Sequence, residues 1–154
     1  MSAIVFRGAN ILGENRADIL VEGEEIRQVG ADLSVDAGTG VSEVDAQGLI
    51  ALPGLVDLHT HLREPGGCDA ETVDTGTAAA AKGGYTAVFA MANTTPTQDC
   101  PQVVEQVLDL GRQAGRVDVH PVGAVTKDLA GKELSDLKGM HQSRAAVNVF
   151  SDDG

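Results

Sequence analysis

Beyond the first third of the chain, short apolar runs alternate with segments of helical pattern, and this alternation constrains the fold more than any other feature. Apolar runs at 55–58, 85–91 and 117–125 predict strands. An alanine-rich segment at 71–82 and an apolar stripe after Pro101 predict helices between them. Strands that alternate with helices favour a parallel sheet with right-handed crossovers. We therefore expect an α/β fold with functional side chains at the carboxyl ends of its strands.

The same pattern gives finer expectations for this part of the chain. Asp69 stands where it can cap the first helix, and apolar residues at 134–140 predict a third helix. Residues 145–150 predict a fourth strand, which Asp152 and Asp153 follow directly. Because successive side chains of an extended chain point to opposite sides, only one of these two carboxylates is expected to face a shared site.

Residues 3–30 follow a different pattern, in which apolar runs are separated by turn signals. The runs are 4–6, 11–12, 19–21 and 26–29. The first turn signal, Arg7-Gly8, separates the first two runs, and no helical period appears. This pattern predicts a set of hairpins, with another strand at 41–46. A small sheet of this kind cannot bury both faces alone, so it needs a companion layer.

Two histidines stand at the end of the first strand of the α/β part. The apolar run at 55–58 predicts a buried strand, and His59 and His61 follow it with one residue between them. On an extended chain their side chains project from the same face, about 7 Å apart along the backbone. Both imidazoles can then reach one metal ion, and zinc is a good partner for neutral imidazole. Two histidines alone do not make a catalytic zinc site, and a motif of this kind by itself is more often a pair of strand histidines, one of them hydrogen-bonded, than a metal site.

Several spaced motifs together resemble a known family. They are Asp57-x-His59-x-His61, Arg63-Glu64-Pro65-Gly66, Met91-Ala92-Asn93-Thr94 and Asp152-Asp153-Gly154. This set resembles the amidohydrolase superfamily, and it is similar to the dihydroorotases in particular. The resemblance implies a β-sandwich segment at residues 1–50 and the first half of a (β/α)8 metal-dependent hydrolase barrel at residues 51–154.

The resemblance also implies roles for individual residues. His59, His61 and Asp153 are expected to hold one or two zinc ions. In many relatives a carboxylated lysine stands where this chain has Asp153, and the aspartate favours the dihydroorotases that use this residue. His61, Arg63 and Asn93 are expected to bind the substrate, with Arg63 and Asn93 at its carboxylate. From the sequence itself, Arg63 shares the strand parity of the histidines if the extended conformation continues, and a guanidinium can bind a carboxylate bidentately.

The implied reaction is the reversible interconversion of N-carbamoyl-L-aspartate and L-dihydroorotate in de novo pyrimidine biosynthesis. The general acid/base aspartate of such an enzyme is expected beyond residue 154. Two alternatives remain open. One is a non-catalytic dihydroorotase-like subunit that partners aspartate transcarbamoylase, and the other is an allantoinase or dihydropyrimidinase type of amidohydrolase. The resemblance also leads us to expect a homo-oligomer.

Composition limits the other function classes. The formal net charge of −12 repels nucleic acid backbones and anionic membranes, so no nucleic acid partner is expected. No apolar run approaches the roughly 20 residues that a membrane helix needs, and we expect a cytoplasmic location. Cys68 and Cys100 are expected to be free thiols. The chain has 154 residues, whereas a complete (β/α)8 barrel typically takes about 250, so we expect it to be the N-terminal part of a longer protein.

Overall fold

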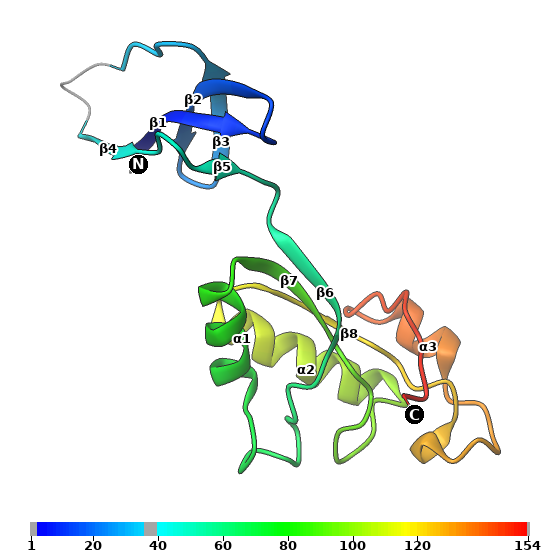
Figure 1. Ribbon diagram of the computed structural model, residues 1–154. Coiled ribbons are helices and arrows are strands. Elements are labelled where there is room, and N and C mark those ends of the chain that lie inside the picture. Colours follow the sequence, from blue (N-terminus) through cyan, green and yellow to red (C-terminus); the bar gives the residue numbers. More distant parts are fainter. Residues whose placement is uncertain (1–2, 36–39, 154) are drawn as a thin grey trace. The chain divides into compact units, whose positions relative to one another are not determined.

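The computed structural model describes residues 3–35 and 40–153, which belong to two compact units, Met1–Pro53 and Gly54–Gly154 (Figure 1). The sequence predicted a division after residue 50, and the units of the structure divide at Pro53. Gly154, the last residue of the Asp-Asp-Gly motif, lies outside the described residues. The assignment of the first unit to a β-sandwich stays a prediction.

The first unit is a five-stranded sheet. Its strands are β1 (Ala3–Ile11), β2 (Asn15–Glu22), β3 (Glu25–Gly30), β4 (Val41–Asp45) and β5 (Ile50–Ala51). The sheet order is β3-β2-β1-β4, and β5 also pairs with β1. The three N-terminal strands pair antiparallel as two hairpins, whereas β4 and β5 run parallel to β1.

The expected turn at Arg7-Gly8 is a β-bulge, because a single strand runs from Ala3 to Ile11. Between the paired positions on either side, these two residues oppose the single residue Asp18 of β2. Gly8 has a φ of +69°, which glycine adopts without strain, and its N–H donates to Asp18 Oδ1 at 2.8 Å. The predicted turn between two separate strands was wrong, because the buried Asp18 accepts the N–H of the bulged Gly8 and strand pairing resumes at Ala9.

The Arg7 guanidinium joins two carboxylates at this bulge, and this contact predicts a pH-dependent stability. Arg7 lies 2.8 Å from Asp18 and 2.6 Å from Glu43, and these hydrogen bonds hold the pKa of both carboxyl groups below their usual range. A carboxyl whose folded-state pKa is depressed stabilises the fold above its unfolded-state pKa, about 3.9 for Asp and 4.3 for Glu. This stabilisation is lost as the pH falls through the folded-state values.

We therefore expect the free energy of unfolding to fall as the pH is lowered from about 5 to about 3, and an Arg7→Met variant to show a weaker dependence over this range. Urea unfolding at a series of pH values measures both. Arg27→Met is the matched control, since Arg27 pairs with two exposed glutamates of the same sheet, Glu22 and Glu25. Equal pH dependence in the Arg7→Met variant and the parent protein would contradict the role given to Arg7.

The second unit is built on three parallel strands. These are β6 (Leu55–Thr60), β7 (Tyr85–Ala90) and β8 (Asp118–Pro121), in the order β6-β7-β8. The helices are α1 (Val73–Lys82), α2 (Pro101–Ala114), a short 3-10 helix (Lys127–Leu129) and α3 (Leu137–Gln142). Helix α1 packs on β7, α2 packs on β8, and the two helices contact each other (Figure 1). The predicted alternation of strands and helices in a parallel sheet is confirmed for these three strands.

Apolar packing holds these layers together. One buried cluster joins the strands to the first two helices and consists of Leu62, Val73, Val88, Ala90, Val107 and Val119. A second cluster ties α2 to α3 and the C-terminal segment through Val104, Met140 and Val147. Helix α1 is capped by Thr72 in a capping box with Thr75, and not by Asp69 as predicted. The capping box satisfies N–H groups at the first turn, and the capping residue therefore lies three residues after the predicted one.

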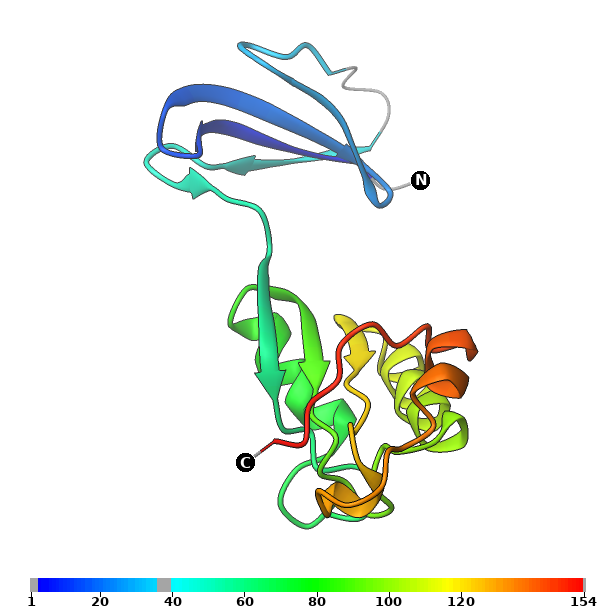
Figure 2. The ribbon, with the colours of Figure 1, turned by 90° about the vertical axis from the view of Figure 1, so that its right-hand side faces the viewer.

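Two strand predictions were wrong. The run at 55–58 was expected to be buried, but Leu55, Val56 and Leu58 are 48%, 52% and 65% exposed. Among the described residues β6 pairs only with β7, so it is an edge strand of this sheet. Residues 145–150 do not form a strand, because only Phe150 pairs, in a parallel bridge to Gly123. Figure 2 shows the segment after α3 running back beside the sheet to the end of β8.

In the described part of the chain, no helix has the length and apolar character needed to cross a membrane.

Candidate metal centre

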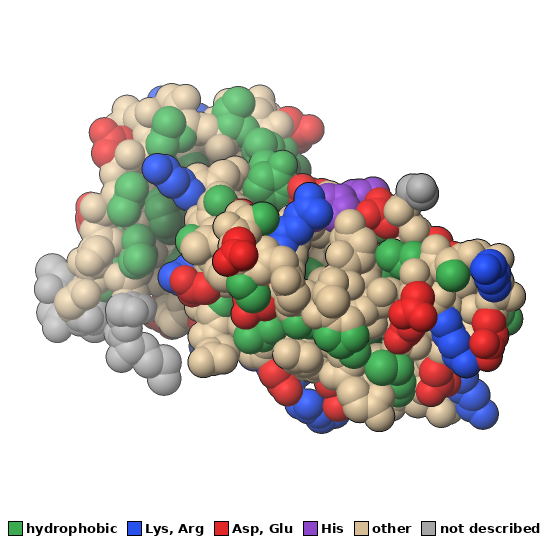
Figure 3. Space-filling view, turned by 90° about the horizontal axis from the view of Figure 1, so that it is seen from below, with side chains coloured by type: hydrophobic (Ala, Val, Ile, Leu, Met, Phe, Trp, Pro, Cys, Tyr) green, Lys and Arg blue, Asp and Glu red, His purple; other side chains and the backbone are tan. Residues whose placement is uncertain are grey.

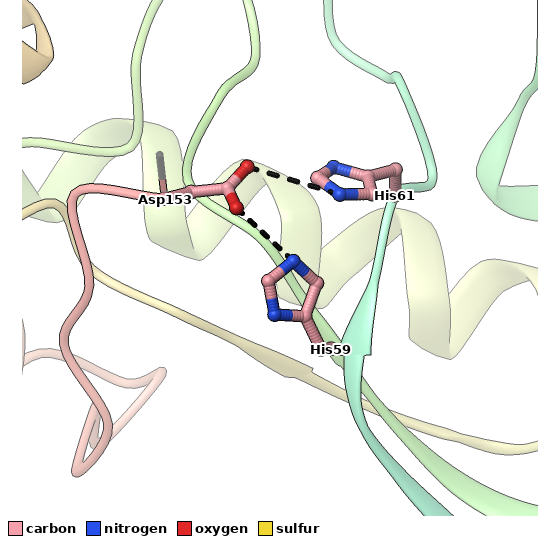
Figure 4. Close-up of side chains that lie close together, drawn as sticks. All are labelled: His59, His61 and Asp153. Carbon is pink, nitrogen blue, oxygen red and sulfur yellow. Dashed lines mark ion pairs between the residues drawn. The ribbon is translucent and has the colours of Figure 1, made fainter.

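Two imidazoles at the end of strand β6 face one carboxylate. His59 lies in β6 and His61 directly follows its last residue, Thr60. Their side chains lie on the same side as predicted, with ring centroids 5.1 Å apart. Asp153 lies between them, with Oδ1 at 3.0 Å from His59 Nε2 and Oδ2 at 3.8 Å from His61 Nε2 (Figure 4). Residues almost a hundred positions apart in the sequence therefore converge at the carboxyl end of β6.

The segment that carries Asp153 is attached to the end of β8. Gly123 N–H donates to Val149 O at 3.0 Å, and Ser151 N–H donates to Gly123 O at 2.9 Å. Asp153 has a φ of +38°, and its N–H donates to Ser151 Oγ at 3.1 Å. Asp152 points away from the histidines toward the loop after β8, where it accepts hydrogen bonds from Val125 and Thr126. The two adjacent carboxylates therefore serve different partners.

The contact between Asn93 and His61 was not predicted from the sequence. Asn93 Oδ1 lies 3.0 Å from His61 Nδ1, which is a hydrogen bond when that nitrogen carries the proton. In this tautomer the lone pair of His61 is on Nε2, the atom that faces Asp153. The sequence assigned Asn93 to the substrate only. Its position after β7, the neighbour of β6, was the available signal for a contact with His61.

The extended conformation does not continue to Arg63, so the predicted face that this residue would share with His59 and His61 does not follow. Strand β6 ends at Thr60, and Arg63 has a φ of +62°, outside the extended region. Leu62 turns into the apolar core instead, where it is 3% exposed. Arg63 is exposed, and its guanidinium makes no ion pair or hydrogen bond with the residues that the structure describes. Its neighbour Glu64 instead accepts the N–H of Val73, at the first turn of α1.

The loop that carries Arg63 contacts the loop that carries Asn93. Thr95 N–H donates to Pro65 O at 2.9 Å. Gly66 lies so close to Thr95 that an added Cβ would stand 2.4 Å from the Thr95 carbonyl oxygen. The loops after β6 and β7 are thus joined, and Arg63 and Asn93 lie on adjoining loops.

The remaining polar candidates have ordinary contacts. Asp57 Oδ1 accepts the backbone N–H of His59 at 3.0 Å. His120 is exposed and stacks on Phe89, and His141 Nδ1 lies 3.1 Å from Val147 O. Cys68 and Cys100 are free cysteines, and Cys68 is exposed.

The three side chains at the end of β6 suit a zinc ion. The nearest ligand atoms of His59, His61 and Asp153 lie within 4.8 Å of one another. Two ligands of a tetrahedral zinc ion are about 3.4 Å apart, so side-chain shifts of about 1 Å would bring all three into its reach. Two imidazole nitrogens and a carboxylate oxygen are also ligand types that zinc accepts.

Solvent reaches one side of this group. The side chain of His59 is 58% exposed, that of His61 30% and that of Asp153 15%. Figure 3 shows imidazole groups at the molecular surface beside acidic side chains. A small molecule can therefore approach the three side chains from this side, in the part of the chain that the structure describes.

Comparison with known proteins agrees with the motifs. Residues 48–154 match a family described as "Dihydro-orotase-like". The chain is 56% identical to a dihydroorotase of Streptomyces coelicolor over 154 residues, which are all of this chain and 35% of that protein. It is 57% identical to a dihydroorotase of Leifsonia xyli subsp. xyli over 150 residues, or 97% of this chain and 34% of that protein. The chain thus spans about a third of the length of the curated relatives that it matches.

A solved structure shares the fold. An L-hydantoinase (dihydropyrimidinase) from Arthrobacter aurescens superposes with a TM-score of 0.67 over 82% of this chain and 29% of its own, at 24% identity. This likeness concerns the fold alone, and it supports the α/β prediction. The resemblance that the motifs carry is confirmed by the match over residues 48–154, and the chain therefore belongs to the dihydroorotase-like family.

Proposed function

We propose that this chain supplies part of the active site of a zinc-dependent dihydroorotase, which interconverts N-carbamoyl-L-aspartate and L-dihydroorotate in pyrimidine biosynthesis. The observation that carries this proposal is the convergence of His59, His61 and Asp153 at a strand end in a chain of this family. Bound zinc would supply an activated water near neutral pH and a Lewis acid for the ring carbonyl. His59 and His61 would hold it through Nε2, and Asp153 through its carboxylate.

Asp153 also bears on the choice among cyclic amides. Its carboxylate provides an anionic oxygen directly, whereas many hydantoinase-type relatives are expected to use a carboxylated lysine at this position. Asp153 lies within hydrogen-bonding distance of His59 without any modification. The side chain present therefore favours a dihydroorotase over a dihydropyrimidinase or an allantoinase.

Three residues are proposed to bind the substrate. L-dihydroorotate carries a ring carboxylate, and the exposed guanidinium of Arg63 is a suitable partner for it. Asn93 stands on the adjoining loop and can offer its amide N–H groups while its Oδ1 faces His61. His61 would then contact both the metal and the substrate. Because the chain carries a net charge of −12, this local basic group is needed to hold an anion.

The test is turnover of L-dihydroorotate by zinc-supplemented protein expressed from the uninterrupted reading frame, with dihydrouracil and allantoin as competing substrates. We expect selective turnover of L-dihydroorotate and its loss on treatment with a chelator. Preferred turnover of dihydrouracil or allantoin would overturn the substrate assignment. If none of the three is converted although zinc is bound, the proposal of a catalytic subunit fails. Addition of aspartate transcarbamoylase would then test the partner alternative.

A further inference from the structure

Asp152 is the most extensively hydrogen-bonded carboxylate near the candidate metal centre, yet it does not face the histidines. Its Oδ1 accepts the N–H groups of Val125 at 2.8 Å and Thr126 at 2.9 Å, and its Oδ2 accepts the hydroxyl of Thr126 at 2.7 Å. A carboxylate with three such donors is held in a defined place and direction.

Thr126 is in turn fixed by its own loop. Its hydroxyl donates to Asp152 and accepts the N–H of Gly131 at 2.9 Å, so both of its hydrogen-bonding functions are used. Thr126 also pairs with Leu134 in an antiparallel bridge that closes the loop at its base. The loop after β8 therefore presents a rigid set of donors to Asp152.

Fixing Asp152 also fixes its neighbour. The two carboxylates leave the backbone in different directions, and Asp153 has a φ of +38°, a conformation that non-glycine residues rarely adopt. Such a conformation persists only where the surrounding contacts impose it. The backbone N–H of Asp153 donates to Ser151 Oγ, and Ser151 N–H donates to Gly123 O. The three hydrogen bonds of Asp152 are a further restraint on the backbone directly before Asp153.

We propose that Thr126 and Asp152 form a positioning pair that holds Asp153 within reach of His59 and His61 and so sets the affinity of the metal centre. The inference rests on the proposed zinc site. Neither residue touches the metal ligands' donor atoms in this arrangement, and the pair acts through the backbone between Asp152 and Asp153. Partners outside the ligand set that orient a metal ligand typically change metal affinity 10- to 100-fold when they are removed.

The test compares the zinc affinity of the parent protein with that of its variants, each expressed from the complete gene. Thr126→Val removes the hydroxyl at nearly constant volume, and we expect it to weaken zinc binding about 10- to 100-fold in competition with a chromogenic chelator. Thr126→Ser keeps the hydroxyl and should stay close to the parent protein. Asp152→Asn is a second variant, which retains the size of the side chain and removes its charge, and should weaken binding in the same direction. Absorption bands of Co²⁺-loaded protein report the geometry of the site without relying on activity.

Ser135→Ala is the matched control for general loosening of the same loop. The Ser135 hydroxyl is buried and donates to Ala124 O, close to the loop base, but it has no contact with Asp152. Wild-type zinc affinity and an unchanged Co²⁺ spectrum in Thr126→Val and Asp152→Asn would overturn the positioning role while leaving the zinc site intact. An equal loss in Ser135→Ala would also overturn it. If the parent protein itself fails to bind zinc or Co²⁺, the proposed function fails first.

Discussion

Replacement of His61 by alanine is expected to lower the zinc affinity of the protein by more than about 100-fold. Loss of a partner outside the ligand set already costs about 10- to 100-fold, and His61 is proposed as a ligand itself. Its Nε2 lies 3.8 Å from Asp153, and Asn93 Oδ1 lies 3.0 Å from its other ring nitrogen. The variant would keep only two of the three candidate ligands, His59 and Asp153. The measurement is zinc content after gel filtration, followed by competition with a chelator.

His120→Ala is the control for this prediction. His120 is an exposed histidine of the same unit that stacks on Phe89 and does not belong to the candidate ligand group. Its loss should leave zinc binding at the parent level. Zinc affinity within a few-fold of the parent in the His61→Ala variant, with a normal fold by circular dichroism, would show that the metal is held elsewhere. Turnover of L-dihydroorotate should fall together with zinc content.

The parts of this structure that follow from local geometry could be predicted from the sequence. His59 and His61 share a face because they are two residues apart at the end of a strand, and the structure keeps that relation. The parallel pairing of β6 with β7 and of β7 with β8 follows from the alternation of strands and helices. The first feature is local, and the second joins strands that follow one another in the sequence, which is why the pattern of residues was sufficient.

Features that depend on distant contacts were missed or needed the family resemblance. Strand parity predicted that Arg63 lies on the same face as the histidines. This prediction fails because Leu62 turns into a core that only the packed helices create. The pattern of residues 145–150 predicts a strand, yet in this segment only Phe150 pairs, in a bridge to Gly123. Strand pairing is decided by the neighbour and not by the run itself. The bulge at Gly8 likewise depends on Asp18, a residue of another strand.

Asp153 illustrates both what the sequence could predict and what it could not. The alternation of an extended chain predicted that Asp152 and Asp153 would diverge, and the structure places them against different partners. Sequence alone could not say which carboxylate would approach the histidines, because that depends on the loop after β8. The resemblance to dihydroorotases favoured Asp153 over Asp152. The role of Asp153 as a metal ligand remains a proposal, which the experiments above test.

Replacement of Gly123 by alanine is expected to disturb both the fold and the metal centre. A Cβ at this position would stand 2.7 Å from two ring carbons of Phe150 and 3.1 Å from Met140 Cε, all within a packed region. The ring cannot stay in place, and overpacking of this kind typically costs about 1–3 kcal/mol of unfolding free energy. Because Ser151 N–H donates to Gly123 O, the displaced segment is the one that carries Asp153.

A double-mutant cycle separates this clash from other effects of the substitution. Without the ring, the nearest atom to the new Cβ would be Met140 Cε at 3.1 Å, so Gly123→Ala should cost less in a Phe150→Ala background than in the parent protein. Urea unfolding measures the stability of all four proteins, and chelator competition measures their zinc affinity. Additive losses of stability would contradict the clash. A stability loss without any loss of zinc affinity would show that Asp153 reaches the histidines independently of the bridge between Gly123 and Phe150, which would leave the hydrogen bonds of Asp152 as its main support.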